Sequence, residues 1–62
     1  MNQYKTTTKN GGKPHIYIAY TPEGALEQEI KRCYDPKEWY VSGNWICNNM
    51  SGWRIEYKVE KL

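Results

Sequence analysis

The 62-residue chain contains no phenylalanine, one histidine and only two cysteines. No C-x-x-C or H-x-x-x-H spacing is present, so the ligand pattern of a structural zinc site is missing. His15, Cys33 and Cys47 are the only soft ligands, and they are too few and too far apart in sequence to suggest a metal centre. We therefore expect no metal and no cofactor, with both cysteines as small, reduced, buried apolar residues.

Long apolar segments are also missing. The first residues show no basic segment followed by an apolar one, and no apolar run approaches the roughly 18 residues that a membrane span needs. We expect neither a signal peptide nor a membrane partner, and the expected location is the cytoplasm.

Catalytic motifs are equally absent. The single imidazole, His15, has no glycine-flanked nucleophile in its sequence neighbourhood. Carboxylate pairs such as Glu27 and Glu29 are typical of ordinary solvated surface, and so short a chain can hardly enclose a substrate pocket. The sequence therefore predicts a protein that is not an enzyme and that acts through its surface.

Aromatic residues are plentiful instead. The chain has three tryptophans and six tyrosines, and each ring can bury on the order of 150 to 250 Å². A single small core cannot hide all of these rings. We expect the surplus to lie on the surface, where Tyr and Trp are frequent anchors of protein interfaces.

The C-terminal segment, residues 53–62, alternates almost perfectly between apolar and charged residues in W-R-I-E-Y-K-V-E-K-L. This period of two predicts an antiparallel strand with one packed and one wet face. The residues assigned to the packed face are Trp53, Ile55, Tyr57 and Val59.

Two further segments have strand character. Residues 4–20 predict a β-hairpin, because Asn10-Gly11-Gly12 separates a threonine-rich run from the β-branched and aromatic run H-I-Y-I-A-Y. Residues 39–47 predict a single strand in which Gly43 forms a bulge or bend. The alternation assigns Trp39, Val41, Trp45 and Cys47 to one face and turns Tyr40 away from it. Residues 48–52 then form a turn into the last strand.

Residues 21–34 leave two alternatives open. Good helix formers, with Thr21 as the cap, Pro22 at the first position and basic residues in the last turn, favour a helix that runs to about Cys33. However, T-P-E-G also suits a β-turn, and Leu26, Ile30 and Tyr34 would share one face of a strand.

These elements predict one small α+β domain over residues 1–62. The expected order is ββαββ, an antiparallel sheet of about four strands with one short helix packed on one face. The alternative is an all-β small barrel or sheet.

The primary functional hypothesis is a small regulator or inhibitor, a type found among other places in phages and mobile elements, that binds a protein through an aromatic-rich sheet surface. From residue 23 onward the chain has six basic and seven acidic residues, whereas strong nucleic-acid binders usually carry a clear excess of basic residues. The residues expected to contact the partner are Tyr40, Tyr17, Tyr20 and Arg54.

The alternative is nucleic-acid binding by the N-terminal hairpin. Residues 1–22 carry three lysines and no acid, so Lys5, Lys9, Lys13 and His15 could contact phosphates while Tyr17 or Tyr20 stacks on bases. Three or four phosphate contacts give weak, salt-dependent binding. A homodimer would double the footprint.

Overall fold

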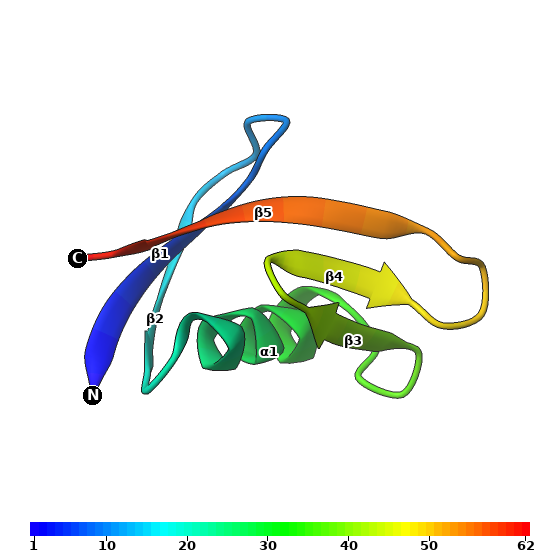
Figure 1. The fold of residues 1–62 in the computed structure, drawn as a ribbon, viewed down its shortest axis with the longest axis horizontal. Helices are drawn as coiled ribbons and strands as arrows, with labels where there is room; N and C mark the ends of the chain where they lie inside the picture. The colour runs from blue at the N-terminus through cyan, green and yellow to red at the C-terminus, as the bar shows by residue number, and fades with distance from the viewer.

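The computed structural model describes all residues from 1 to 62 and contains five strands and one helix, in the order ββαβββ (Figure 1). The strands form one antiparallel sheet in the order β2-β1-β5-β4-β3, curled into a half-barrel. The α+β class is confirmed, and the all-β alternative is wrong because residues 22–33 are helical. The element bounds are β1 Asn2–Thr8, β2 His15–Ala19, α1 Pro22–Cys33, β3 Trp39–Ser42, β4 Trp45–Asn48 and β5 Arg54–Lys61.

The extra strand arises at Gly43. The segment expected to be one bent strand is a tight hairpin, in which Ser42 pairs with Trp45 and only Gly43 and Asn44 lie between them. Gly43 has a φ of 62°, and no non-glycine residue of the chain has a positive φ. A positive φ at the first central position alone is the pattern of a type II′ turn, which matches the twist of paired strands. The expectation of a bulge at Gly43 is therefore wrong.

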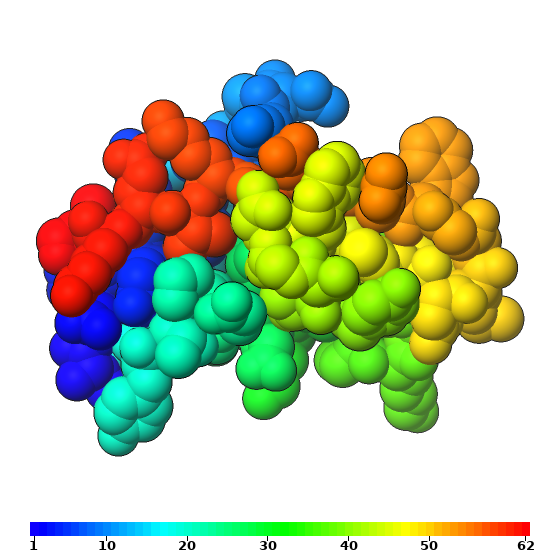
Figure 2. Space-filling view, viewed as in Figure 1, coloured from blue at the N-terminus to red at the C-terminus, as the bar shows by residue number.

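The N-terminal hairpin is confirmed. β1 and β2 pair from Asn2 with Ala19 to Thr6 with His15. Gly11, with a φ of 89°, begins the return of the loop, and its N–H donates to the Thr8 carbonyl at 2.9 Å. This loop stands out from the body of the molecule, as does the turn between β4 and β5 (Figure 2).

The helix is also confirmed, with the expected start and end. The Thr21 hydroxyl accepts a hydrogen bond from the Gly24 N–H at 3.0 Å, and Pro22 occupies the first turn. This cap satisfies one of the free N–H groups at the helix start. At the other end the Tyr34 N–H donates to the Ile30 carbonyl, after which Asp35-Pro36 leaves the helical conformation.

β5 is the central strand, because it pairs with β1 on one side and β4 on the other. Tyr57 is buried, and Ile55 and Val59 are half-buried, as the alternation predicts. Trp53 is 73% exposed, so its assignment to the packed face is wrong. It lies in the turn that precedes β5, beyond the part of the sheet that α1 covers (Figure 1).

The core lies between α1 and the concave face of the sheet. One cluster consists of Leu26, Ile30, Ile46 and Tyr57, and the other of Tyr4, Tyr17, Ala19 and Ala25. Leu26 and Ile46 have no exposed surface. No helix in the structure is both long enough and apolar enough to cross a membrane.

Candidate functional site

The convex face of the sheet, on the side away from α1, presents side chains of β3 and β4. Trp39 and Val41 pack against the core with the fully buried Ile46. Because successive strand residues point to opposite faces, Tyr40 and Trp45 lie on the convex side. Tyr40 is exposed there, and Trp45 is half-buried.

Tyr40, Trp45 and Arg54 form the convex patch. Tyr40 on β3 and Arg54 on β5 are both opposite Cys47 of β4, so they belong to one row across the sheet. The guanidinium carbon of Arg54 lies 4.6 Å from the centre of the Trp45 ring. This cation–π stack holds the charge in place, and Arg54 forms no ion pair within the chain. Arg54 therefore presents a positive charge on the same face as Tyr40, two strands away, and Tyr40 is 50% exposed.

The part of the convex face around β5 carries balanced charge, whereas Ile16 and Ile18 of β2 are exposed on the same face. Lys9 pairs with Glu56 at 3.2 Å, and Lys58 pairs with Glu60 at 3.4 Å. Exposed pairs of this kind contribute little to stability, typically about 0 to 1 kcal/mol. They give the convex patch a polar rim without a dominant sign of charge.

An open groove borders the convex patch. It lies between α1 and β3, has a volume of about 390 Å³, and is lined by Ile30, Trp39, Tyr40 and Val41 together with polar helix residues. Tyr40 thus contributes both to the groove and to the convex face. This edge of the molecule therefore offers an open recess of mixed apolar and polar lining that adjoins Tyr40.

The four residues expected to bind a protein do not all come together. Tyr17 is only 9% exposed, because His15, Tyr17 and Ala19 turn toward the helix, so the expectation of a surface ring at Tyr17 is wrong. Tyr20 is 74% exposed but follows β2, at the opposite edge of the sheet from Tyr40. Tyr40 and Arg54 remain, joined by Trp45. The assignment of Trp45 and Cys47 to the same face as Trp39 and Val41 is wrong, because the turn at Gly43 reverses the alternation.

The four residues expected to contact nucleic acid are also dispersed. Lys9 is paired with Glu56, Lys5 is directly across from Glu60, and Lys13 lies in the exposed loop after β1. His15 faces inward and bonds to Glu29. They form no continuous basic surface.

Glu29, on the inner face of α1, is the centre of a second distinctive cluster and is 4% exposed. Its carboxylate accepts hydrogen bonds from the hydroxyls of Tyr17 and, at 3.1 Å, Tyr57. The Nδ1 atom of His15 lies 2.9 Å from the same carboxylate. The expectation that Glu29 lies on the solvated surface is therefore wrong. Glu29 follows Ala25 by four residues, so the two share one side of the helix, and Ala25 is buried. This spacing is the sequence feature that could have indicated burial of Glu29.

The surroundings shift the pKa values of Glu29, Tyr17 and Tyr57 in this cluster. Burial raises the pKa of Glu29, but hydrogen bonds from Tyr17, His15 and Tyr57 more than offset this, so the pKa lies below its ordinary value. Burial and the neighbouring Glu29 raise the pKa of Tyr17 to about 12. Burial and bonds to Tyr34 and Glu29 also raise the pKa of Tyr57. The cluster is thus an ionised carboxylate held by neutral hydroxyls.

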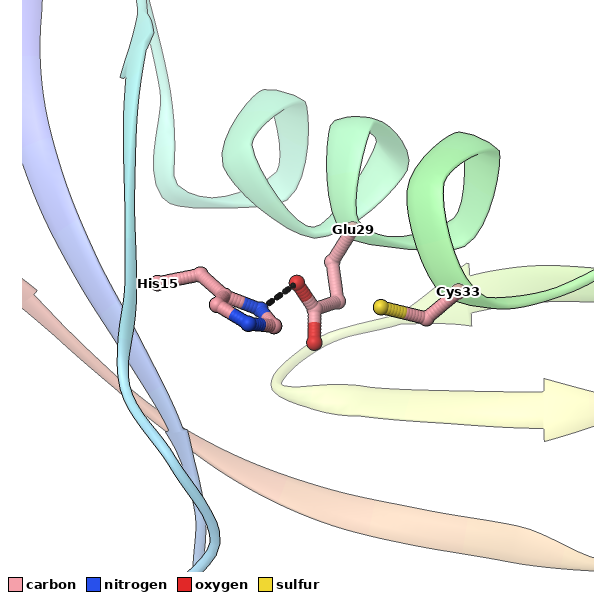
Figure 3. Close-up of side chains that lie close together, drawn as sticks. All are labelled: His15, Glu29 and Cys33. Atoms are coloured by element: carbon pink, nitrogen blue, oxygen red, sulfur yellow. Dashed lines mark hydrogen bonds and ion pairs between the residues drawn. The ribbon is translucent and has the colours of Figure 1, made fainter.

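Cys33 completes the cluster at the end of α1. Donor atoms of Cys33, Glu29 and His15 all lie within 4.8 Å of one another. Figure 3 shows the thiol and the imidazole on either side of the carboxylate. Cys33 is exposed and Cys47 is half-buried, so the expectation that both are buried is wrong. Partial desolvation of the sulfur and the nearby Glu29 raise the pKa of the Cys33 thiol.

Comparison of the chain with protein-family models, with curated proteins and with solved structures found no match.

Proposed function

We propose that this chain is a small, non-enzymatic regulator or inhibitor that binds a protein partner in the cytoplasm through its convex patch. The observation that supports the proposal best is the stack of Arg54 on Trp45 beside the exposed ring of Tyr40. Trp, Tyr and Arg are the residues that most often dominate binding energy at protein interfaces.

The side chains of the convex patch are also preorganised for binding. The three side chains come from three hydrogen-bonded neighbouring strands, and the Trp45 ring already orders the Arg54 side chain. Binding then loses less side-chain entropy than it would with flexible groups. A matching partner surface offers an apolar pocket for Tyr40 and a carboxylate for Arg54.

Nucleic-acid binding is the weaker candidate. Of the three lysines in the basic N-terminal part, Lys9 is paired with an acid and Lys5 is opposite one. Binding to the phosphate backbone depends on the release of counterions by unpaired basic groups. The pairing of charges on this face favours a protein partner.

The test begins with quantitative capture of partners from a cell lysate treated with nuclease. The captured partner is then purified and titrated with the Tyr40→Ala, Arg54→Ala and Tyr20→Ala variants. We expect the first two to weaken Kd by roughly 30-fold, about 2 kcal/mol each. Tyr20→Ala is the matched control, because Tyr20 is an exposed ring at the other edge of the sheet, and it should leave Kd unchanged.

Equal losses in all three variants, or none in the first two, would contradict the proposal. A titration with random-sequence DNA and RNA at low salt checks the other candidate. Binding that is abolished when Lys5, Lys9 and Lys13 are all changed to Gln would favour nucleic acid instead. Size-exclusion chromatography of the same samples shows whether a homodimer forms.

A further inference from the structure

Donor atoms of three kinds meet where the N-terminal hairpin contacts the helix. His15 is the first residue of β2, whereas Glu29 and Cys33 are one turn apart on α1. Residues four apart on a helix lie on the same side, so the carboxylate and the thiol approach the imidazole together. Imidazole nitrogen, carboxylate oxygen and thiolate sulfur are the three ligand types that Zn²⁺ accepts in proteins.

The spacing is close to that of a metal site. Bonds of about 2.0 Å to nitrogen or oxygen and about 2.3 Å to sulfur, in tetrahedral geometry, place ligand atoms roughly 3.5 Å apart. The atoms of this cluster lie within 4.8 Å of one another, and Nδ1 of His15 is 2.9 Å from Glu29. Cys33 is exposed and can rotate its side chain to close the remaining gap of about 1 Å.

We propose that His15 Nδ1, one carboxylate oxygen of Glu29 and Cys33 Sγ bind a Zn²⁺ ion, with water as the fourth ligand. The ion takes the place of the hydrogen bond between His15 and Glu29. Binding requires a thiolate, so the Cys33 proton is released to solvent. The convex patch, on the other side of the sheet, takes no part, and the two proposals are independent.

The groups around the cluster suit this role. Tyr17 and Tyr57 both donate to the Glu29 carboxylate, from β2 and from β5. Hydrogen bonds to a ligating carboxylate orient it and support metal binding. Glu29 is a negative charge with 4% exposure, and a divalent cation is the natural counter-charge for such a group.

Metal binding would cross-link β2 and α1. The ion would join the start of β2 to the last turn of α1, two elements that otherwise meet through side-chain packing and a few hydrogen bonds. Domains of about 60 residues have small cores, and a metal or a disulfide adds to their limited stability. Both cysteines are free thiols, so Cys33 is available as a ligand.

The experiment uses the full chain, dialysed against a chelator and kept reduced, and titrates it with Zn²⁺ and separately with Co²⁺. Co²⁺ reports thiolate ligation through a charge-transfer absorption band in the near ultraviolet. We expect one equivalent of either ion to bind. Zn²⁺ at 100 times its Kd should raise Tm by roughly 10 °C or more.

The variants identify the ligands. Cys33→Ser should remove the charge-transfer band and most of the shift in Tm, and its exposed position lets the protein fold. Cys47→Ser is the matched control, because Cys47 lies on the convex side of β4, and it should retain both signals. His15→Gln should weaken binding at least tenfold. The proposal is overturned if neither ion binds, if Cys33→Ser keeps the band, or if Cys47→Ser loses it.

Discussion

The hydroxyl of Tyr57 on β5 donates a hydrogen bond to the carboxylate of Glu29 on α1 at 3.1 Å, between residues 28 positions apart. The same hydroxyl lies 2.9 Å from that of Tyr34. The bond connects the central strand to the helix inside the core, where a polar group without a partner is costly.

This relationship predicts unequal effects of two matched substitutions. Tyr57→Phe keeps the ring but removes both the bond to the charged Glu29 and the bond with Tyr34, so it should lower the free energy of unfolding by about 2 kcal/mol or more. Tyr34→Phe removes only a bond between two neutral hydroxyls and should cost about 1 kcal/mol or less. Urea denaturation measures both, and equal costs would contradict the importance assigned to Glu29.

The protonation of Glu29 predicts loss of stability in acid for the metal-free protein. Its pKa is lower in the folded state than in the unfolded chain, where a glutamate has a pKa of about 4.3. Its contribution is therefore present above the unfolded pKa and is lost as the pH falls through the folded pKa. Denaturation curves from pH 7 to pH 3 test this. Glu29→Gln should have lower stability at pH 7 and a flatter pH dependence.

Truncation of the Leu26 side chain is predicted to be strongly destabilising, because it leaves a cavity in the core. Leu26 has no exposed surface, so Leu26→Ala should reduce the free energy of unfolding by about 2 to 5 kcal/mol, much of the stability of so small a domain. Lys31→Ala, on the exposed side of the same helix, should change it by less than about 0.5 kcal/mol. Similar melting temperatures for the two variants would show that Leu26 is not a core residue.

The turn between β3 and β4 predicts a requirement for glycine. Gly43 has a φ of 62° and a β-carbon there would meet no other atom, so the cost of a side chain is purely conformational. Gly43→Ala should destabilise the protein by about 1 to 3 kcal/mol. Ser42→Ala, at the adjacent exposed position, is the control and should be nearly neutral. A stable Gly43→Ala variant would indicate a different turn.

Local signals explain what the sequence predicted correctly. The Thr21-Pro22 start and the charges at the two ends specify α1, and Asn10-Gly11 specifies the first hairpin. Both depend on interactions within a few residues. The alternation of residues along the strands also assigned Tyr40 and Arg54 correctly to the solvent-exposed face.

The errors have a different origin. A glycine in a strand-like run fits either a bend within one strand or a two-residue turn between two strands. The pattern at Gly43 therefore did not predict that β3 and β4 are separate strands. In β2 both faces are apolar, with Ile16 and Ile18 on one and Tyr17 and Ala19 on the other, so periodicity could not tell which side is buried. Glu29 is held by tyrosines and a histidine from other elements, and such long-range pairing is invisible in a local pattern.

The position of β5 between β1 and β4 also has a consequence for how the chain folds during synthesis. The two outer hairpins, β1 with β2 and β3 with β4, have no common neighbour in the sheet until residues 54–61 have left the ribosome. Until then Leu26, Ile30 and Ile46 lack the cover of Tyr57, whereas the cluster of Tyr4, Tyr17, Ala19 and Ala25 contains no residue of β5. Assembly of the sheet must therefore follow translation of β5, through contacts such as Thr6 with Val59 that span most of the chain.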